Sequence, residues 1–281
     1  MSGRTFATSH YKRYYTAAKP AVFQHELLAA VHNMLKLVAK RTSLTLDEHD
    51  LEKGVNDFMF KVQEDAFKHD TDLKENVGAV AEYLWTSAKT HAVVDYMQLC
   101  SVLNMVIRDD VEEEVEAAVI FFRGINARRV MRRGGIDTSY PPNGKIWRGG
   151  GFRRQHRAFF ERMQGRKYRV PAFLASSTQR SVAAKFAFDA FAANDSHPCA
   201  IWCIQVDKRG KRHPEHRVKH MTFVSKTLVK GEEEYLFAPY SVFTLVSCRW
   251  SDELCKPHEI TLHAACDNKK EDEHLVLTPW Y

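Results

Sequence analysis

Three consecutive glutamates, Glu232-Glu233-Glu234, precede an apolar run that is typical of a β-strand, Tyr235-Leu236-Phe237-Ala238. Alternate side chains of an extended backbone point to the same face, so Glu232 and Glu234 are predicted to share a face that Glu233 does not. Two like charges on one face do not favour stability. Two carboxylates on one face suit a site that stabilises a positive charge developing during a reaction. The alternative interpretation is that the three glutamates form a solvated turn.

Two segments upstream carry side chains that can bind an anionic ligand. Arg148 precedes Gly149-Gly150-Gly151, so a guanidinium able to grip a phosphate stands beside a backbone that a ligand can approach closely. Ser176, Ser177 and Thr178 stand between an apolar, strand-like segment and a helical one. One hydroxyl is expected to cap the helix, which leaves the others available to a ligand.

These residues must be positioned by a β-rich half of the chain. Residues 140–281 contain short β-like segments between glycine, proline and charged turns, with one helix predicted over 181–191. Residues 19–135 instead show apolar side chains at three- and four-residue spacing, which predicts amphipathic helices that pack on one another. We therefore predict an α+β fold, with a helical lobe over 19–135, a β-rich lobe over 140–281 and a flexible N-terminus over 1–18.

Within these lobes the pattern predicts individual elements. The expected helices cover 21–38, 47–67, 77–89, 93–107 and 112–133. The expected strands cover 145–147, 168–174, 200–206, 221–224, 234–237, 241–250, 259–265 and 274–278.

Composition narrows the class of protein. The 281 residues are 44% hydrophobic and 27% charged, as in ordinary globular proteins. No apolar run has membrane-spanning length and the N-terminus lacks a secretory signal. A cytoplasmic protein, or one delivered into a host cytosol, is therefore expected.

Charge and cysteine content indicate which ligands to expect. The net charge of +6 favours an anionic partner such as a phosphate-bearing cofactor. The basic clusters lack interleaved aromatics, so nucleic-acid binding is not expected. The six cysteines form no disulfide framework, and Cys199 and Cys203 do not have the spacing of a zinc site, so no metal is expected.

In their order along the chain, the arginine, the hydroxyl cluster and the glutamates resemble the motifs of the R-S-E class of mono-ADP-ribosyltransferases (arginine, Ser-Thr-Ser, Glu-x-Glu). The resemblance covers residues 99–250 and includes the segment 99–108, which is similar to the family's helix before the first motif, and the segment 232–243. It implies an NAD-binding core of two packed, mainly antiparallel sheets, NAD as substrate and no metal. A glutamate at 232, and not a glutamine, resembles the arginine-specific branch.

The resemblance also implies residue roles. Glu234 would be the catalytic carboxylate. It would accept a hydrogen bond from the 2′-hydroxyl of the nicotinamide ribose and face the ribosyl cation that forms when nicotinamide leaves. Glu232 would orient or deprotonate the acceptor, and Glu233 is expected to contribute little. Arg148 would hold the pyrophosphate, and the backbone of Gly149 would bind the nicotinamide amide.

The serine motif departs from the family pattern. Ala175 stands where the family has its first serine, so Ser176 is the first candidate to steady the catalytic glutamate and Ser177 the second. By the resemblance, an aromatic side chain stacks on nicotinamide. Phe186 and Phe191 are both candidates, and core packing is the alternative for each.

The expected activity is transfer of ADP-ribose from NAD to an exposed arginine of an acceptor protein by a monomer. The segment 224–231 would contact that acceptor. The residues are also compatible with two alternative functions. One is an NAD glycohydrolase, in which water is the acceptor, and the other is a non-catalytic binding domain that retains the fold.

Overall fold

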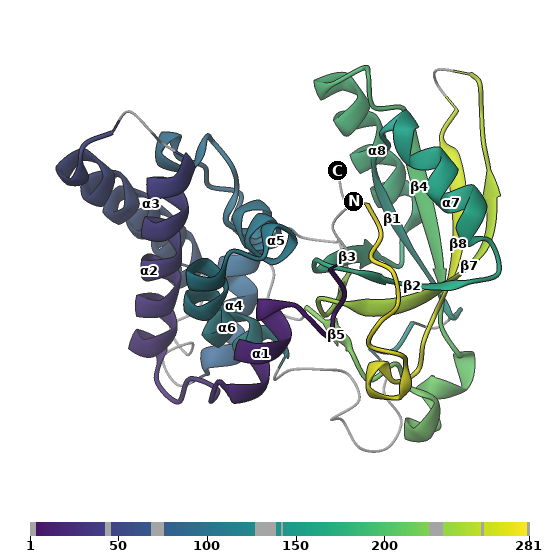
Figure 1. The fold of residues 1–281 in the computed structure, drawn as a ribbon, viewed down its shortest axis with the longest axis horizontal. Coiled ribbons are helices and arrows are strands. Elements are labelled where there is room, and N and C mark those ends of the chain that lie inside the picture. The colour runs from purple at the N-terminus through teal and green to yellow at the C-terminus, as the bar shows by residue number, and fades with distance from the viewer. Residues whose placement is uncertain are drawn as a thin grey trace. The chain divides into compact units, whose positions relative to one another are not determined.

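The computed structural model describes residues 4–42, 46–68, 76–126, 139–141, 143–224, 233–253 and 256–279. In these residues a run of α-helices precedes the first strand, and two further α-helices lie among the strands. The chain divides into a helical unit, described over 8–126, and a β-rich unit, described over 4–7 and from 139 onward (Figure 1). The α+β class and the order of helices before strands are thus confirmed. In the described part of the chain, no helix is long and apolar enough to span a membrane.

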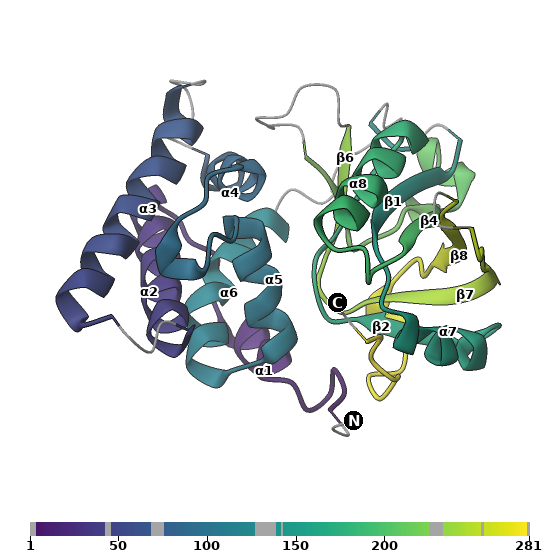
Figure 2. The same ribbon diagram turned by 90° about the horizontal axis from the view of Figure 1, so that it is seen from above.

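The helical unit is organised around α6, which packs against four other helices: α1, α2, α4 and α5. Its helices are α1 (His10–Ala17), α2 (Gln24–Thr42), α3 (Glu48–Lys68), α4 (Val77–Thr86), α5 (Leu99–Asp109) and α6 (Glu112–Asn126). The buried carboxylate of Glu114 on α6 accepts two hydrogen bonds from Arg41 of α2, at 2.5 and 3.0 Å. This pair joins α6 to α2, and Figure 2 shows the two helices side by side.

Two predicted helices differ from those observed. The helix expected over 93–107 is a short 3₁₀ turn, Ala92–Val94, followed by α5, because Asp95 and Tyr96 have positive φ values of 53° and 54°. The helix expected over 112–133 is described as far as Asn126, and the rest of the prediction lies outside the described residues.

Helix α1 lies in a segment that was predicted to be flexible. Ser9 caps its N-terminus by accepting from Lys12 N at 3.1 Å. The carboxylate of Asp110, about a hundred positions along the chain, accepts from the backbone N–H groups of His10 (3.0 Å) and Tyr11 (3.1 Å). The local sequence did not reveal this helix because Asp110 satisfies its end from a distance.

The strands of the β-rich unit form one mixed sheet in the order β2-β7-β8-β4-β1-β3-β6-β5. β4 and β8 run parallel and the other neighbouring pairs are antiparallel. The bounds are β1 (Lys145–Gly151), β2 (Lys167–Val170), β3 (Leu174–Ser177), β4 (Cys199–Gln205), β5 (Met221–Phe223), β6 (Glu234–Phe237), β7 (Ser241–Arg249) and β8 (His258–Ala264).

The expected pair of sheets is therefore corrected to a single sheet with a narrow junction. Strands β3, β6 and β5 join the other five where Trp147 of β1 pairs with Ser177 of β3. Three neighbouring strands meet at this junction. β1 carries the arginine of the first motif, β3 carries the serines and β6 carries Glu234. The sheet order thus explains how three distant motifs meet.

Three other elements differ from the prediction. The strand expected over 168–174 is divided into β2 and β3 around Pro171, which lacks the N–H that a ladder requires. Helix α7 (Arg157–Met163) was not predicted. The strand expected over 274–278 is reduced to an isolated bridge between Leu277 and Arg169.

Alternating side chains of β4 pack on the two faces of the sheet. Trp202 and Ile204 belong to the main aromatic core, which α7 joins through Phe159 and Phe160. Cys199 and Ile201 face the other way and pack with Ala187 of α8 (Arg180–Ala193). Helix α8, predicted over 181–191, therefore covers the face opposite the main core, alongside β1 and β4 (Figures 1 and 2).

Arg169 of β2 is a buried charge that the local sequence pattern does not predict. Its surface is 1% exposed, and burial lowers the pKa of its guanidinium. The guanidinium lies 4.8 Å from the Phe6 ring. It donates hydrogen bonds of 2.9 to 3.4 Å to four backbone carbonyl oxygens, those of Tyr240, Asn268, Glu271 and Asp272. Arg169 thereby holds segments from both ends of the chain against β2.

We expect Arg169→Leu to lower the free energy of unfolding by about 3 kcal/mol, because buried carbonyl oxygens would lose their donors. Urea unfolding followed by circular dichroism measures the change. Arg166→Leu, at an exposed arginine in the turn before β2, is the control and should change stability by less than about 0.5 kcal/mol. Equal effects of the two substitutions would contradict a structural role for the buried guanidinium.

Candidate active site

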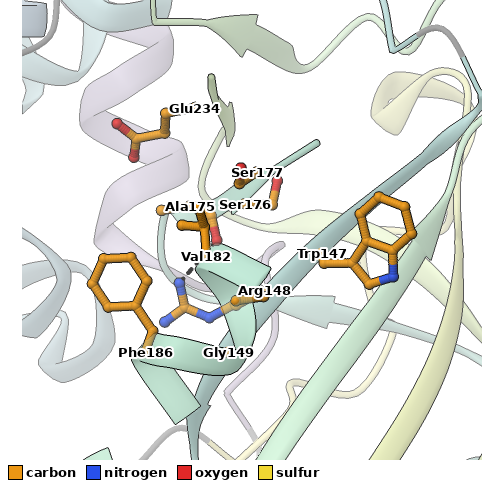
Figure 3. A pocket seen from close by; sticks show the side chains of 10 residues that line it. Trp147, Arg148, Gly149, Ala175, Ser176, Ser177, Val182, Phe186 and Glu234 are labelled. Carbon is orange, nitrogen blue, oxygen red and sulfur yellow. Dashed lines mark hydrogen bonds between the residues drawn. The ribbon is translucent and has the colours of Figure 1, made fainter. Parts of the chain in front are cut away.

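A pocket of about 230 Å³ opens in the β-rich unit where β1, β3, β6 and α8 meet. Apart from the second aromatic candidate, Phe191, the predicted site residues that the structure describes line it: Arg148, Gly149, Ser176, Ser177, Phe186 and Glu234. Figure 3 shows Arg148 and Phe186 toward one end of the pocket and Glu234 toward the other. Glu232 and most of the predicted acceptor segment, 225–231, lie outside the described residues.

Glu234 is the first residue of β6, and 8% of its surface is exposed. Its backbone is held on both sides, by pairing with Ser177 of β3 and by the N–H of Val224, which donates to its carbonyl oxygen at 2.9 Å. Because the carboxylate extends from a paired strand into a pocket, its position is set by the sheet.

The predicted alternation of the three glutamates is wrong at Glu233. β6 begins at Glu234, as predicted, and Glu233 directly before it has a positive φ of 42°, so no extended backbone runs through Glu233. Its carboxylate is also engaged, because it accepts a hydrogen bond from the hydroxyl of Thr178. Glu233 was expected to contribute little, and this hydrogen bond is a contact that was not expected for it.

Strand register distinguishes the two candidate serines. Ser177 lies directly opposite Glu234, whereas Ser176 lies opposite Tyr235 and donates its hydroxyl to the carbonyl oxygen of Tyr235 at 3.0 Å. Side chains opposite each other in a ladder share a face, so Ser177 shares the face of Glu234. The second candidate, not the first, therefore lies across from the glutamate.

The helix after the serine strand is not capped in the predicted way. Its N-cap residue is Gln179, which makes no side-chain cap hydrogen bond. The hydroxyl of Ser177 instead accepts from Gln179 N at 3.1 Å. Ser177 therefore contacts both the turn into α8 and the ladder to Glu234.

Arg148 is fixed by the strand next to its own. Its Nη1 donates to the carbonyl oxygen of Ala175 at 3.1 Å, across the junction between β1 and β3 (Figure 3). Ala175, which lacks the hydroxyl of the family motif, thus still contributes its backbone to the site. The guanidinium is held where an anionic group in the pocket can reach it.

Gly149 lines the pocket and also allows close helix packing, so the expectation that its backbone binds a ligand stays a prediction. A Cβ at this position would lie 1.6 Å from the carbonyl oxygen of Ala183 and 2.9 Å from the backbone nitrogen of Ala187. Only a residue without a side chain allows α8 to approach β1 this closely. That approach brings Ala183 and Phe186 to the pocket wall.

The two candidate aromatics have different surroundings. Phe186 lines the pocket and is 50% exposed. Phe191, one and a half turns further along α8, packs against the cluster of Ala187, Cys199 and Ile201. Of the two, Phe186 is the ring that a ligand in the pocket can meet.

Three residues that line the pocket were not predicted from their residue types: Trp147, Val182 and Ala183. Trp147 precedes Arg148, and the spacing of Val182, Ala183 and Phe186 is that of one helix face, so helical periodicity anchored on Phe186 could have found two of them.

Among the described residues, no group of three or more His, Cys, Asp or Glu side chains could hold a metal ion. Burial raises the pKa of the Cys203 thiol.

Taken together, the pocket combines a fixed cation, a carboxylate on a paired strand, a hydroxyl opposite that carboxylate and a half-exposed aromatic ring. Such a set can bind a ligand with both an anionic group and a planar ring. The carboxylate is available to stabilise positive charge on the part of the ligand between them.

This chain is similar to known proteins in structure but matches none of the compared families or curated proteins in sequence. No family model matches the chain, and no curated protein matches it in sequence. Similar solved structures include the ADP-ribosyltransferase HopU1 of Pseudomonas syringae pv. Tomato, with 16% identity, a TM-score of 0.47 and coverage of 84% of this chain and 97% of that one.

Two other similar structures are bacterial. The ADP-ribosyltransferase Vis of Vibrio splendidus, in complex with an inhibitor, has 13% identity and a TM-score of 0.47, with 78% of this chain and 86% of that one covered. The type III effector XopAI of Xanthomonas axonopodis pv. citri has 13% identity and a TM-score of 0.44, with 91% of each chain covered. ADP-ribosyltransferases are thus among the solved structures similar to this chain.

Proposed function

We propose that this chain is a mono-ADP-ribosyltransferase of the R-S-E class, which transfers ADP-ribose from NAD to an arginine of an acceptor protein. The observation that carries the proposal is the meeting of Arg148, Ser177 and Glu234 around one pocket. These residues come from three neighbouring strands and stand in the order that the family motifs predict. Their chemistry matches the pyrophosphate, the ribose and the cation of the reaction.

In the proposed reaction the bond between C1′ of the nicotinamide ribose and the ring nitrogen of nicotinamide breaks. Nicotinamide leaves with the bonding electrons, and the ribose becomes an oxocarbenium-like cation that the Glu234 carboxylate stabilises. Arg148 binds the pyrophosphate, and Phe186 stacks on the nicotinamide ring. Each of these groups would act from an element that the sheet or α8 holds in place.

Transfer is completed when a guanidinium nitrogen of the acceptor bonds to C1′ and gives up a proton. We assign that proton to Glu232, two residues before Glu234 in the sequence. If water takes the place of the acceptor, the same pocket hydrolyses NAD. A binding domain that retains the fold would take up NAD without cleaving it.

Incubation with NAD labelled in its adenylate part separates these activities. Purified protein is tested alone, with a protein lysate and with agmatine, a small guanidine. Label on protein or agmatine that neutral hydroxylamine releases supports arginine transfer. Free ADP-ribose with no labelled acceptor would replace the proposal by NAD hydrolysis, and binding without NAD consumption would replace it by a non-catalytic domain.

Glu232→Gln tests the acceptor assignment. We expect transfer to agmatine to fall by about 100-fold or more, because the amide cannot take the acceptor proton, while cleavage of NAD by water persists. Separate assays of labelled agmatine and of free nicotinamide measure the two activities. Glu253→Gln, at an exposed glutamate that is not among the residues lining the pocket, is the control. Arginine transfer that survives Glu232→Gln would show that the acceptor assignment is wrong.

A further inference from the structure

The ladder between β3 and β6 ends at the pair of Ser177 and Glu234, which is the pair that lines the pocket. Continuing the same register by one residue places Thr178 opposite Glu233. Neither residue belongs to a strand, yet the Thr178 hydroxyl donates a hydrogen bond to the Glu233 carboxylate. A side-chain hydrogen bond therefore extends the ladder past its last backbone pair.

The backbone at Glu233 makes this contact informative. With φ at 42°, Glu233 adopts a left-handed conformation that disfavours residues with a side chain. A glutamate in that conformation persists where surrounding contacts hold it. The bond from Thr178, together with the bond from Val224 N to the Glu234 carbonyl oxygen, supplies such contacts on either side of the strand start.

We propose that Thr178 and Glu233 are positioning residues, which hold the first residue of β6 so that the Glu234 carboxylate stays directed into the pocket. The first residue of a strand otherwise tends to fray, and fraying here would move the carboxylate itself. Glu233 acts through its hydrogen bond and not through its charge. The inference rests on the proposed cleavage of NAD, in which Glu234 faces the ribosyl cation.

Substitutions that remove the hydrogen bond test this role. Thr178→Val and Glu233→Ala are each expected to lower kcat for NAD cleavage about fivefold, the effect of one lost hydrogen bond, with KM for NAD unchanged. The double variant should be no slower than either single variant, because both changes remove the same contact. Glu161→Gln is the control, since it alters an exposed carboxylate that pairs with Arg157 on α7, away from the pocket.

Conservative variants separate positioning from chemistry. Thr178→Ser keeps the donor and Glu233→Gln keeps an acceptor, so both should retain most of the wild-type kcat. If kcat falls as far in Glu233→Gln as in Glu233→Ala, the charge of Glu233 acts directly and the positioning role is overturned. Unchanged kcat in both Thr178→Val and Glu233→Ala would overturn it as well.

Amide hydrogen exchange gives a test that does not depend on activity. Residues 234–237 should exchange faster in Thr178→Val than in the wild type, while Glu161→Gln leaves them unchanged. If the wild-type protein consumes no NAD, the proposed function fails, and exchange still decides whether this hydrogen bond fixes the start of β6. Identical exchange in Thr178→Val and wild type would then reject the inference.

Discussion

Glu234→Gln is expected to lower kcat for NAD cleavage by about three orders of magnitude, whether arginine or water is the acceptor. The substitution keeps the shape of the side chain and removes the negative charge that would face the ribosyl cation. Because Arg148 and Phe186 would still hold the substrate, KM for NAD should change little. Release of nicotinamide, followed by chromatography, measures both parameters.

The matched control is Glu259→Gln, on β8 of the same sheet. Glu259 pairs with Arg180 and Arg249 at the surface, so its loss should leave cleavage near the wild-type level. Circular dichroism of both variants confirms that the fold is kept. Cleavage by Glu234→Gln within tenfold of the wild type would show that this carboxylate is not the catalytic group, since removing a group that stabilises transition-state charge typically lowers kcat by about 100- to 1,000-fold.

Gly149→Ala is expected to lower the free energy of unfolding by about 3 kcal/mol, because the new methyl group would collide with backbone atoms of α8. An approach of 1.6 Å to the carbonyl oxygen of Ala183 cannot be relieved by a side-chain rotation, because both atoms belong to fixed positions of the backbone and the new Cβ. The helix must shift as a whole, and Phe186 shifts with it. We therefore also expect kcat/KM for NAD to fall.

Gly150→Ala provides the control one residue away on the same strand. Among the described residues, a Cβ at Gly150 would meet a Trp202 ring carbon at 3.7 Å, which is an ordinary contact, so the substitution should change stability by less than about 0.5 kcal/mol. Thermal unfolding and NAD cleavage of the two variants are compared side by side. If Gly149→Ala is as stable and as active as Gly150→Ala, close packing of α8 on β1 does not define the pocket.

Local patterns in the sequence were sufficient for most elements. Helical spacing located α2, α3, α4 and α8, and alternation or apolar runs located strands such as β4, β6 and β7. Those patterns work because an element buries one face against its neighbours, and that requirement is visible over a few residues. They failed for α1, whose end is capped by Asp110, and for the strand that Pro171 divides.

The candidate site was predictable in its chemical groups and less so in their arrangement. The order of Arg148, the serine strand and the glutamates indicated which side chains would meet. Register then placed Ser177, and not Ser176, across from Glu234, and the left-handed backbone of Glu233 ended the predicted alternation. A shift of one residue exchanges the faces of a strand, so local pattern alone does not fix this choice.

The sequence by itself therefore determined the types of element, their order and the inventory of reactive groups. Tertiary structure alone decided how α8 approaches Gly149, why Arg169 is buried and how Thr178 meets Glu233. The physical reason is the range of the interactions involved. Periodicity arises from contacts within a few residues, whereas these contacts join backbone and side-chain atoms that are 34 to 103 positions apart.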